Sequence, residues 1–280
     1  MKKRSSPLLN APYMLWCLLF VLVPMGMVVF YAFSDRQGGF TLEIFRALTA
    51  TAEKRASLAH VFGYSMLYAL AATAICLLLA YPLAYFMAHS GRSAQRNLML
   101  LIMVPMWMNF LICTYSWRTI LNDNGVINSL LGWLHLPAVR MLFTPGAVIL
   151  GMVYNFLPYM ALPIFTVMQK LSPSLVEAAQ DLGATGFGVL RKVTLPMSLP
   201  GIASGITMVF VPSVSTFYIS QKLGGSKTML IGDLIEMQFL TAYDYNTGAA
   251  LSLILMLLIV LCMMVMKRFS DGSEEGAFVV

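Results

Sequence analysis

The sequence predicts an all-α membrane protein with six transmembrane helices. Of its 280 residues, 59% are hydrophobic and only 11% are charged, and the mean hydropathy is +0.78. An average soluble domain carries about 25% charged residues, so lipid rather than water is the main solvent of this chain. Backbone groups in lipid must be satisfied internally, and long apolar runs are therefore expected to be helices.

Six apolar runs are long enough, at about 20 residues each, to cross the hydrocarbon core of a bilayer. They cover residues 13–33, 62–88, 97–117, 145–169, 199–220 and 247–266, and none of them contains Asp, Glu, Lys or Arg. We interpret residues 13–268 as a single six-helix transmembrane domain. Residues 1–12 and 269–280 are then its cytoplasmic N-terminal and C-terminal tails.

The first run follows MKKRSS and lacks a small-residue cleavage site, so we interpret it as a retained span rather than a secretory signal. Lys and Arg near the span ends favour a cytoplasmic N-terminus, with ten on the inside and eight outside. The ten are Lys2, Lys3, Arg4, Arg92, Arg96, Lys170, Arg191, Lys192, Lys267 and Arg268. An even number of spans puts both termini in the cytoplasm. The pI of about 9.2 then reflects membrane topology, and no nucleic-acid partner is expected.

The spans contain no group that would drive transport. Proton- and ion-coupled transporters place ionisable side chains at mid-membrane, so a secondary transporter is disfavoured, although sodium sites built from backbone carbonyls leave it open. The segment LGGSKT, with Lys227, lacks the G-x-x-x-x-G-K-[ST] spacing of a nucleotide-binding loop. The four cysteines lie inside the spans at no metal-like spacing. We therefore expect no enzyme activity, no bound metal and no cofactor. The energy for transport should then be supplied by a partner protein.

A patterned polar segment, LVEAAQDLGATGFGVLRKVTLPMSLPGI, separates the fourth and fifth runs. Ser174 and Glu177 fit a capping box at the start of a short helix, and Ser172 before Pro173 offers an alternative start. Gly183 is a natural stop. A second short helix ending in Arg191 and Lys192 should follow. LPMSLPG should then turn the chain back into the membrane.

The first short helix presents two faces. Leu175, Ala178, Ala179 and Leu182 share one of them at i, i+3, i+4, i+7 spacing. Glu177 and Asp181 share another, where two like charges cost an isolated helix a few tenths of a kcal/mol, so a basic partner would offset the repulsion. The simplest alternative is a surface hairpin that merely connects two spans.

The order of residues favours a more specific interpretation. Glu177-Ala178-Ala179, Gly183, Val193, Leu195 and Pro196 follow the pattern E-A-A, three residues, G, nine residues, I-x-L-P, with Val193 in place of Ile. The segment resembles the cytoplasmic loop of the permease subunits of binding-protein-dependent (MetI-like) ABC importers. This resemblance implies a coupling loop over residues 172–198 that docks on an ATPase subunit.

The same resemblance assigns roles within the coupling loop. It implies Glu177 as a polar contact, Ala178 and Ala179 as a close-packing face and Gly183 as the bend. The partners it implies are a second homologous permease subunit, two ATP-binding subunits that hold the ATP, and an extracytoplasmic binding protein. The full set assigned to coupling is Glu177, Ala178, Ala179, Asp181, Gly183, Leu195 and Pro196.

Segments 102–121, 143–164 and 224–240 are similar to those of spermidine/putrescine permeases, which implies a polyamine substrate and a polyamine-binding protein. Importers of sulfate, iron, thiamine or phosphonate share this architecture and stay as alternatives. A polyamine suits carboxylates and aromatic faces, where cation–π contact contributes about 0.5–2 kcal/mol. Since the spans contain no fixed cation, nothing in them would repel such a solute.

These preferences select nine candidate residues for the substrate pathway: Trp107, Asn109, Tyr115, Tyr154, Asn155, Tyr159, Tyr218, Asp233 and Glu236. An interfacial aromatic belt or helix packing would explain the aromatic members equally well. In the fifth run, Gly201 and Gly205 form a small-x-x-x-small pair that allows close helix approach.

Overall fold

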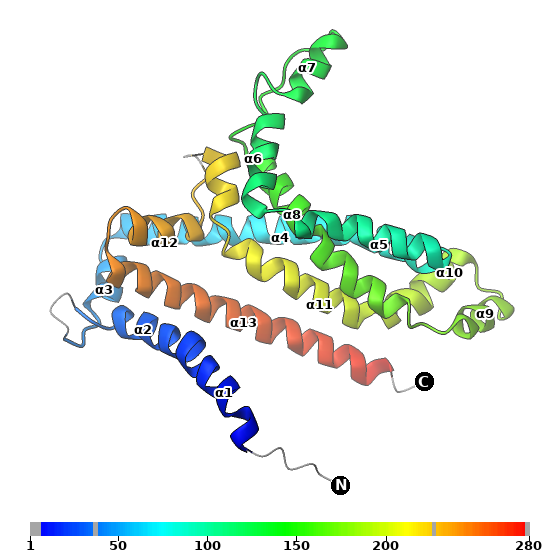
Figure 1. The fold of residues 1–280 in the computed structure, drawn as a ribbon, viewed down its shortest axis with the longest axis horizontal. Helices are drawn as coiled ribbons and strands as arrows, with labels where there is room; N and C mark the ends of the chain where they lie inside the picture. Colours follow the sequence, from blue (N-terminus) through cyan, green and yellow to red (C-terminus); the bar gives the residue numbers. More distant parts are fainter. Residues whose placement is uncertain (1–6, 36–38, 226–227, 278–280) are drawn as a thin grey trace. The chain divides into compact units, whose positions relative to one another are not determined.

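The computed structural model describes residues 7–35, 39–225 and 228–277, and its named elements in these ranges are all helical. The predicted all-α fold is thereby confirmed. Two compact units divide the chain: the first joins residues 1–59 to 234–258, and the second joins 60–233 to 259–280. Figure 1 gives the order of the helices. That both units act as a single membrane domain stays a prediction.

The first unit contains α1 (Pro7–Cys17), the π-helical turn η1 (Leu18–Leu22), α2 (Val23–Ala32), α3 (Glu43–Thr49), most of α12 (Ile231–Leu240) and the first part of α13 (Tyr245–Ala277). Its core consists of Ala32, Ala249, Ala250 and Leu253. Asn246 in α13 donates hydrogen bonds to the backbone carbonyls of Tyr31 and Ser34. The end of α2 is therefore fixed to the start of α13 by polar as well as apolar contacts.

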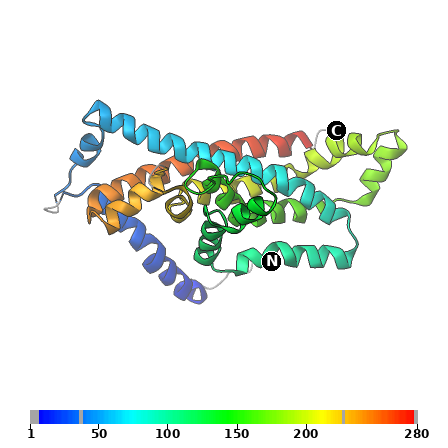
Figure 2. The ribbon, with the colours of Figure 1, turned by 90° about the horizontal axis from the view of Figure 1, so that it is seen from above.

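The second unit contains most of α4 (Ala52–His89), α5 (Arg92–Trp107), α6 (Phe110–Ile120), α7 (Val126–Trp133), α8 (Pro145–Met168), α9 (Pro173–Asp181), α10 (Gly186–Val189), the π-helical turn η2 (Leu190–Thr194), α11 (Leu195–Val214) and the π-helical turn η3 (Ser220–Gly224). Helices α8 and α11 form its main packing contact. Figure 2 shows α9 and α10 at one end of this unit.

The predicted glycine pair lies in the contact between α8 and α11. A Cβ atom on Gly201 would lie 2.9 Å from the carbonyl oxygen of Pro163, and one on Gly205 would lie 3.1 Å from that of Met160. Real Cβ atoms essentially never come within 3.0 Å of another heavy atom, and a distance of 3.1 Å is tighter than nine in ten real Cβ contacts. The two backbones thus approach closely because the side chains are absent, which is the expected use of small residues between membrane helices.

Among the described residues, five helices are long and apolar enough to cross a membrane: Pro12–Ala32, Ala52–His89, Pro145–Met168, Gly186–Val214 and Tyr245–Met266. They match the first, second, fourth, fifth and sixth predicted spans. The fifth ends at Val214 rather than at Ser220, and the second begins ten residues before the predicted Phe62.

The third predicted span, 97–117, is a broken helix rather than a straight one. Helices α5 and α6 are bent by 91° at the break between Trp107 and Phe110. Met108 and Asn109 have extended backbones there, and the Asn109 side chain accepts hydrogen bonds from the amides of Leu111 and Ile112. This N-cap starts a new helix inside an apolar run. Hydropathy alone does not register such a break.

Candidate functional site

Helix α9 begins where the alternative prediction placed it. Ser172 occupies the N-cap position in extended backbone, and Pro173 is the first helical residue. Proline is favoured at that position because its missing N–H would have no helical partner. The Ser172 side chain makes no capping bond to the backbone, and its Oγ lies 2.7 Å from the Ser174 Oγ. The Ser174–Glu177 capping box is therefore not the start of this helix.

Gly183 ends α9, as predicted. Its φ of +82° lies in the left-handed region that favours glycine. The Gly183 amide donates to the carbonyl of Gln180 at 2.8 Å, and the Ala184 amide donates to that of Ala179 at 3.0 Å. These two bonds form a Schellman motif, which satisfies carbonyls at the end of a helix. The bend after α9 is thus built into the local backbone.

The surface of α9 is largely open. None of its described side chains is buried: Val176 and Ala179 are half-buried, while Glu177, Ala178 and Asp181 are exposed. The side chain of Leu182, directly after the helix, is 90% exposed. The predicted apolar face is therefore divided, with Ala179 turned toward the chain and Leu175, Ala178 and Leu182 uncovered. An apolar surface of this kind is available to a partner.

The segment after α9 differs from its prediction. Residues Gly186–Val214 form one continuous helical stretch through α10, η2 and α11, so LPMSLPG makes no separate turn. The π-helical turn η2 lies directly before α11, with Pro196 in the first turn of that helix and Pro200 inside it. Thr185 begins the stretch by accepting a hydrogen bond from the Gly188 amide at 3.3 Å.

The side chains of this continuous stretch divide between the chain's interior and its surface. Phe187 is 73% exposed, and Arg191 and Lys192 are also exposed. Val189 and Thr194 are buried. Phe187 therefore adds an exposed apolar side chain after Gly183 to those on α9. Two basic side chains follow one to two turns later.

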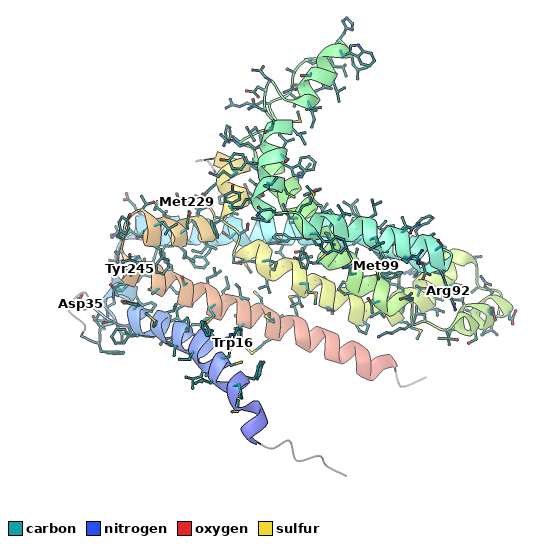
Figure 3. The ribbon with its side chains drawn as sticks, viewed as in Figure 1. Trp16, Asp35, Arg92, Met99, Met229 and Tyr245 are labelled. Carbon is teal, nitrogen blue, oxygen red and sulfur yellow. The ribbon has the colours of Figure 1, made fainter. Side chains whose placement is uncertain are left out.

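A glutamine network that the sequence did not suggest ties the neighbouring helix ends together. Gln95 in α5 donates through Nε2 to the carbonyls of Ala88 and Ser90, and its Oε1 accepts from Gln169 after α8 at 3.2 Å. Arg92, labelled in Figure 3, marks the start of α5 at the same end of this unit as α9 and α10. The base of the loop is thus held by polar bonds among three helices.

The candidate pathway residues in the third predicted span fall on both sides of its bend. Trp107 is the last residue of α5 and is 70% exposed, whereas Tyr115 lies in α6. Asn109 uses its side-chain oxygen to cap α6. The bend therefore separates Trp107 from Tyr115 along the chain, and Asn109 lies at the break itself. Their role in substrate transport stays a prediction.

The three candidates on α8 make contacts within their own unit. The Tyr154 ring meets that of Trp117 edge-on, with centroids 5.3 Å apart. Asn155 donates through Nδ2 to the carbonyl of Gly151 at 2.8 Å. The Tyr159 ring lies 6.5 Å from that of Phe156 and is partly exposed. These contacts are compatible with helix packing, the alternative stated from the sequence.

The two acidic candidates differ in environment. Asp233 is buried, and its carboxylate accepts hydrogen bonds from Ser220 Oγ at 2.9 Å and from the Leu230 amide at 2.8 Å. Glu236 is half-buried on α12 and lies in the first unit. The Asp233 carboxylate therefore has a structural task, which is to hold η3 to the start of α12.

Tyr115 and the last tyrosine candidate, Tyr218, both lie close to the ammonium of Lys222. The Nζ atom of Lys222 lies 5.8 Å from the ring centroid of Tyr115 and 5.5 Å from that of Tyr218. The guanidinium carbon of Arg118 is 5.9 Å from the Tyr115 ring. The predicted spans contain no fixed cation, but Lys222 and Arg118 lie close to these two candidate rings. Neither basic residue lies within the predicted spans.

Comparison with known proteins gives consistent similarities. Residues 80–274 match the family described as "Binding-protein-dependent transport system inner membrane component". The spermidine/putrescine transport system permease protein PotB of Escherichia coli is 36% identical over 258 residues, which are 91% of this chain and 94% of that protein. PotB of Haemophilus influenzae is 36% identical over 261 residues, or 90% of each chain.

A solved structure is similar in fold. It is a bacterial alginate ABC transporter in complex with an alginate pentasaccharide-bound periplasmic protein, matched with a TM-score of 0.75 at 19% identity. The match covers 94% of this chain and 92% of the other.

Proposed function

The chain belongs to the family of binding-protein-dependent transport system inner membrane components, and on that premise we propose that it is a permease subunit of an ATP-driven polyamine importer. It forms half of a translocation pathway and performs no covalent chemistry. A second homologous permease completes the pathway, two ATP-binding subunits supply the energy, and an extracytoplasmic binding protein delivers the polyamine. Both termini lie in the cytoplasm.

The observation that carries the coupling part of this proposal is the exposed helix α9. The seven-residue pattern that begins on α9 is complete apart from Val193. Leu175 and Ala178 on the helix and Leu182 directly after it are uncovered. A connector loop would be expected to bury such side chains on its own chain, since each buried Leu contributes about 1.5–3 kcal/mol. Closure of an ATPase pair against α9 would move α8 and α11, which flank it in the chain and pack together.

Spermidine and putrescine are the favoured substrates because the relatives with that printed name cover nearly the whole chain. The fold alone does not identify the substrate, since a bacterial ABC transporter involved in the import of the acidic polysaccharide alginate has a similar fold. An importer for another small solute, such as sulfate, iron, thiamine or phosphonate, would use the same coupling loop. A secondary transporter is a more distant alternative and would need no ATPase.

Uptake of radiolabelled spermidine and putrescine tests the proposal, in cells that express the permease with its partner subunits. The variant Glu177→Lys reverses an exposed charge on α9. We expect at least a tenfold loss of uptake with an unchanged amount of protein in the membrane. Glu53→Lys is the control, because Glu53 is also an exposed helical glutamate but lies in α4, away from the loop.

The outcomes separate the parts of the proposal. If the wild type takes up neither polyamine, the substrate assignment is wrong and the other solutes become the leading candidates. Normal uptake by Glu177→Lys would mean that α9 is a connector. Uptake that persists without the ATP-binding subunits would favour a secondary transporter.

A further inference from the structure

One lysine ammonium lies against two tyrosine rings from different parts of the chain. Lys222 belongs to η3 and contacts Tyr218 four residues before it as well as Tyr115 on α6. Both distances, 5.8 and 5.5 Å, lie within the range of about 6 Å for cation–π attraction. Among the residues that the structure describes, no carboxylate is found in an ion pair with Lys222. The rings are therefore its identified partners.

The backbone beneath Lys222 is held in place. Leu223 is fully buried, and its carbonyl accepts a hydrogen bond from the Phe143 amide at 2.8 Å. On the other side, Ser220 is buried and donates to the Asp233 carboxylate at 2.9 Å. Since Ser220 and Leu223 are fixed, displacement of Lys222 from the rings would have to come from its half-buried side chain rather than from the backbone of η3.

Of the two rings, Tyr115 is reachable by a solute, whereas Tyr218 is half-buried. The Tyr115 side chain is 48% exposed, and it borders a cavity of about 420 Å³. The cavity is also lined by Arg118 and by the neutral polar residues Thr119, Asn122 and Asn124. A primary ammonium at the end of a methylene chain is the chemistry of the Lys222 side chain. It is equally the chemistry of each end of a polyamine.

We propose that Lys222 is a tethered competitor for the polyamine. Its ammonium occupies the Tyr115–Tyr218 pair in the absence of substrate, and one ammonium of the polyamine displaces it during passage. A neutral or anionic solute gains nothing from the rings and leaves Lys222 in place. Lys222 is thus a specificity-determining residue, an inference that rests on the polyamine substrate proposed above.

The test is equilibrium binding of radiolabelled spermidine to the complete importer in lipid nanodiscs, without the binding protein, so that the permease pathway alone contributes. The variant Lys222→Met removes the competing charge and keeps the methylene chain. Because cation–π contacts contribute about 0.5–2 kcal/mol, we expect spermidine to bind about 2- to 30-fold more tightly. Lys222→Arg keeps a cation over the rings and should bind spermidine like the wild type.

Two further variants separate competition from a structural role. Adding Tyr115→Leu to Lys222→Met should abolish the gain, since one of the two rings that Lys222 contacts is then missing, although Arg118 beside Tyr115 is unchanged. Lys54→Met is the control for loss of a lysine elsewhere, in the first unit, and should leave the affinity unchanged. A structural clamp between η3 and α6 predicts the opposite pattern for Lys222→Met, which would lower the unfolding temperature without tightening binding.

Binding by Lys222→Met that equals or falls below that of the wild type would overturn the inference. So would a gain that survives Tyr115→Leu, or the absence of detectable spermidine binding in every variant. Uptake by cells with the full importer is measured in parallel. If the wild type imports spermidine but Lys222→Met binds no more tightly, this inference fails while the proposed function stands. If the wild type imports no polyamine, both fail.

Discussion

Two glycines in the second unit show how differently its regions are held. At Gly201 in α11, a Cβ atom would lie 2.9 Å from the backbone of Pro163 in α8, so the missing side chain lets two helices touch. At Gly183, after α9, a Cβ atom would meet nothing within 4 Å, and a φ of +82° is what requires glycine. Helix α11 is positioned by a neighbour, whereas the end of α9 is shaped by its own backbone.

This difference matters for the mechanism. Packing against α8 fixes α11, and the surface of α11 that is buried in this contact is not available to another molecule. Because α9 depends on local hydrogen bonds instead, it keeps its shape while its apolar side chains stay uncovered. The contrast predicts that substitutions in the contact between α8 and α11 lower stability most. Substitutions in and directly after α9 should reduce coupling to the ATPase and lower stability less.

The largest effect on stability is expected at the helix contact. Gly201→Val would force α8 and α11 apart, and overpacking of this kind costs about 1–3 kcal/mol. Thermal unfolding of the purified protein in detergent measures the loss. Gly186→Ala is the matched control, since a Cβ atom there meets nothing within 4 Å and alanine is the better helix former. Equal stability of Gly201→Val and wild type would show that the contact is not tight.

A smaller effect on stability is expected from Gly183→Val. A β-branched residue in left-handed backbone costs about 1–2 kcal/mol, and relaxation at the end of α9 would absorb part of that strain locally. Polyamine uptake should fall because α9 no longer presents the same surface. Gly183→Asn tolerates this backbone better and should retain more uptake. If Asn and Val lose uptake equally, the positive φ is not the reason for glycine here.

Much of the fold follows from apolar runs of sufficient length. The fourth run was predicted at 145–169 and the helix is Pro145–Met168, while the sixth was predicted at 247–266 and the span is Tyr245–Met266. The third run was predicted as one helix because it is long enough to span a bilayer and contains no charged residue. The hydrogen bonds that Asn109 accepts from two amides cap a new helix there, and a hydropathy pattern carries no information about such bonds.

The candidate site was predictable where a local pattern determines it. Gly183 and the exposed Glu177 belong to a continuous stretch, so their spacing was sufficient. The Lys222 contacts were not predictable, because they depend on a π-helical turn and on a tyrosine more than 100 positions earlier in the chain. Asp233 was selected as a carboxylate of the substrate pathway, and its sequence neighbours do not reveal that it is buried and accepts a hydrogen bond from Ser220.

The smallest effect on stability is expected at Leu182, where the contrast between the two regions is sharpest. The side chain is 90% exposed, so Leu182→Gln removes almost no packing and should change stability by no more than about 0.5 kcal/mol. If an ATPase subunit buries this leucine, the same substitution removes about 1.5–3 kcal/mol from docking. Uptake should therefore fall about tenfold or more while the unfolding temperature stays the same.

Leu134→Gln is the matched control for Leu182→Gln, because Leu134 is also an exposed leucine directly after a short helix, α7, away from the loop. It should leave both uptake and unfolding unchanged. Uptake is measured in cells with the complete importer, and unfolding is measured on the purified permease. A fall in the unfolding temperature of Leu182→Gln comparable to that of Gly201→Val would mean that α9 is held by its own chain after all. Unchanged uptake with unchanged stability would instead remove Leu182 from the docking surface and leave Glu177 and the alanines to carry the contact.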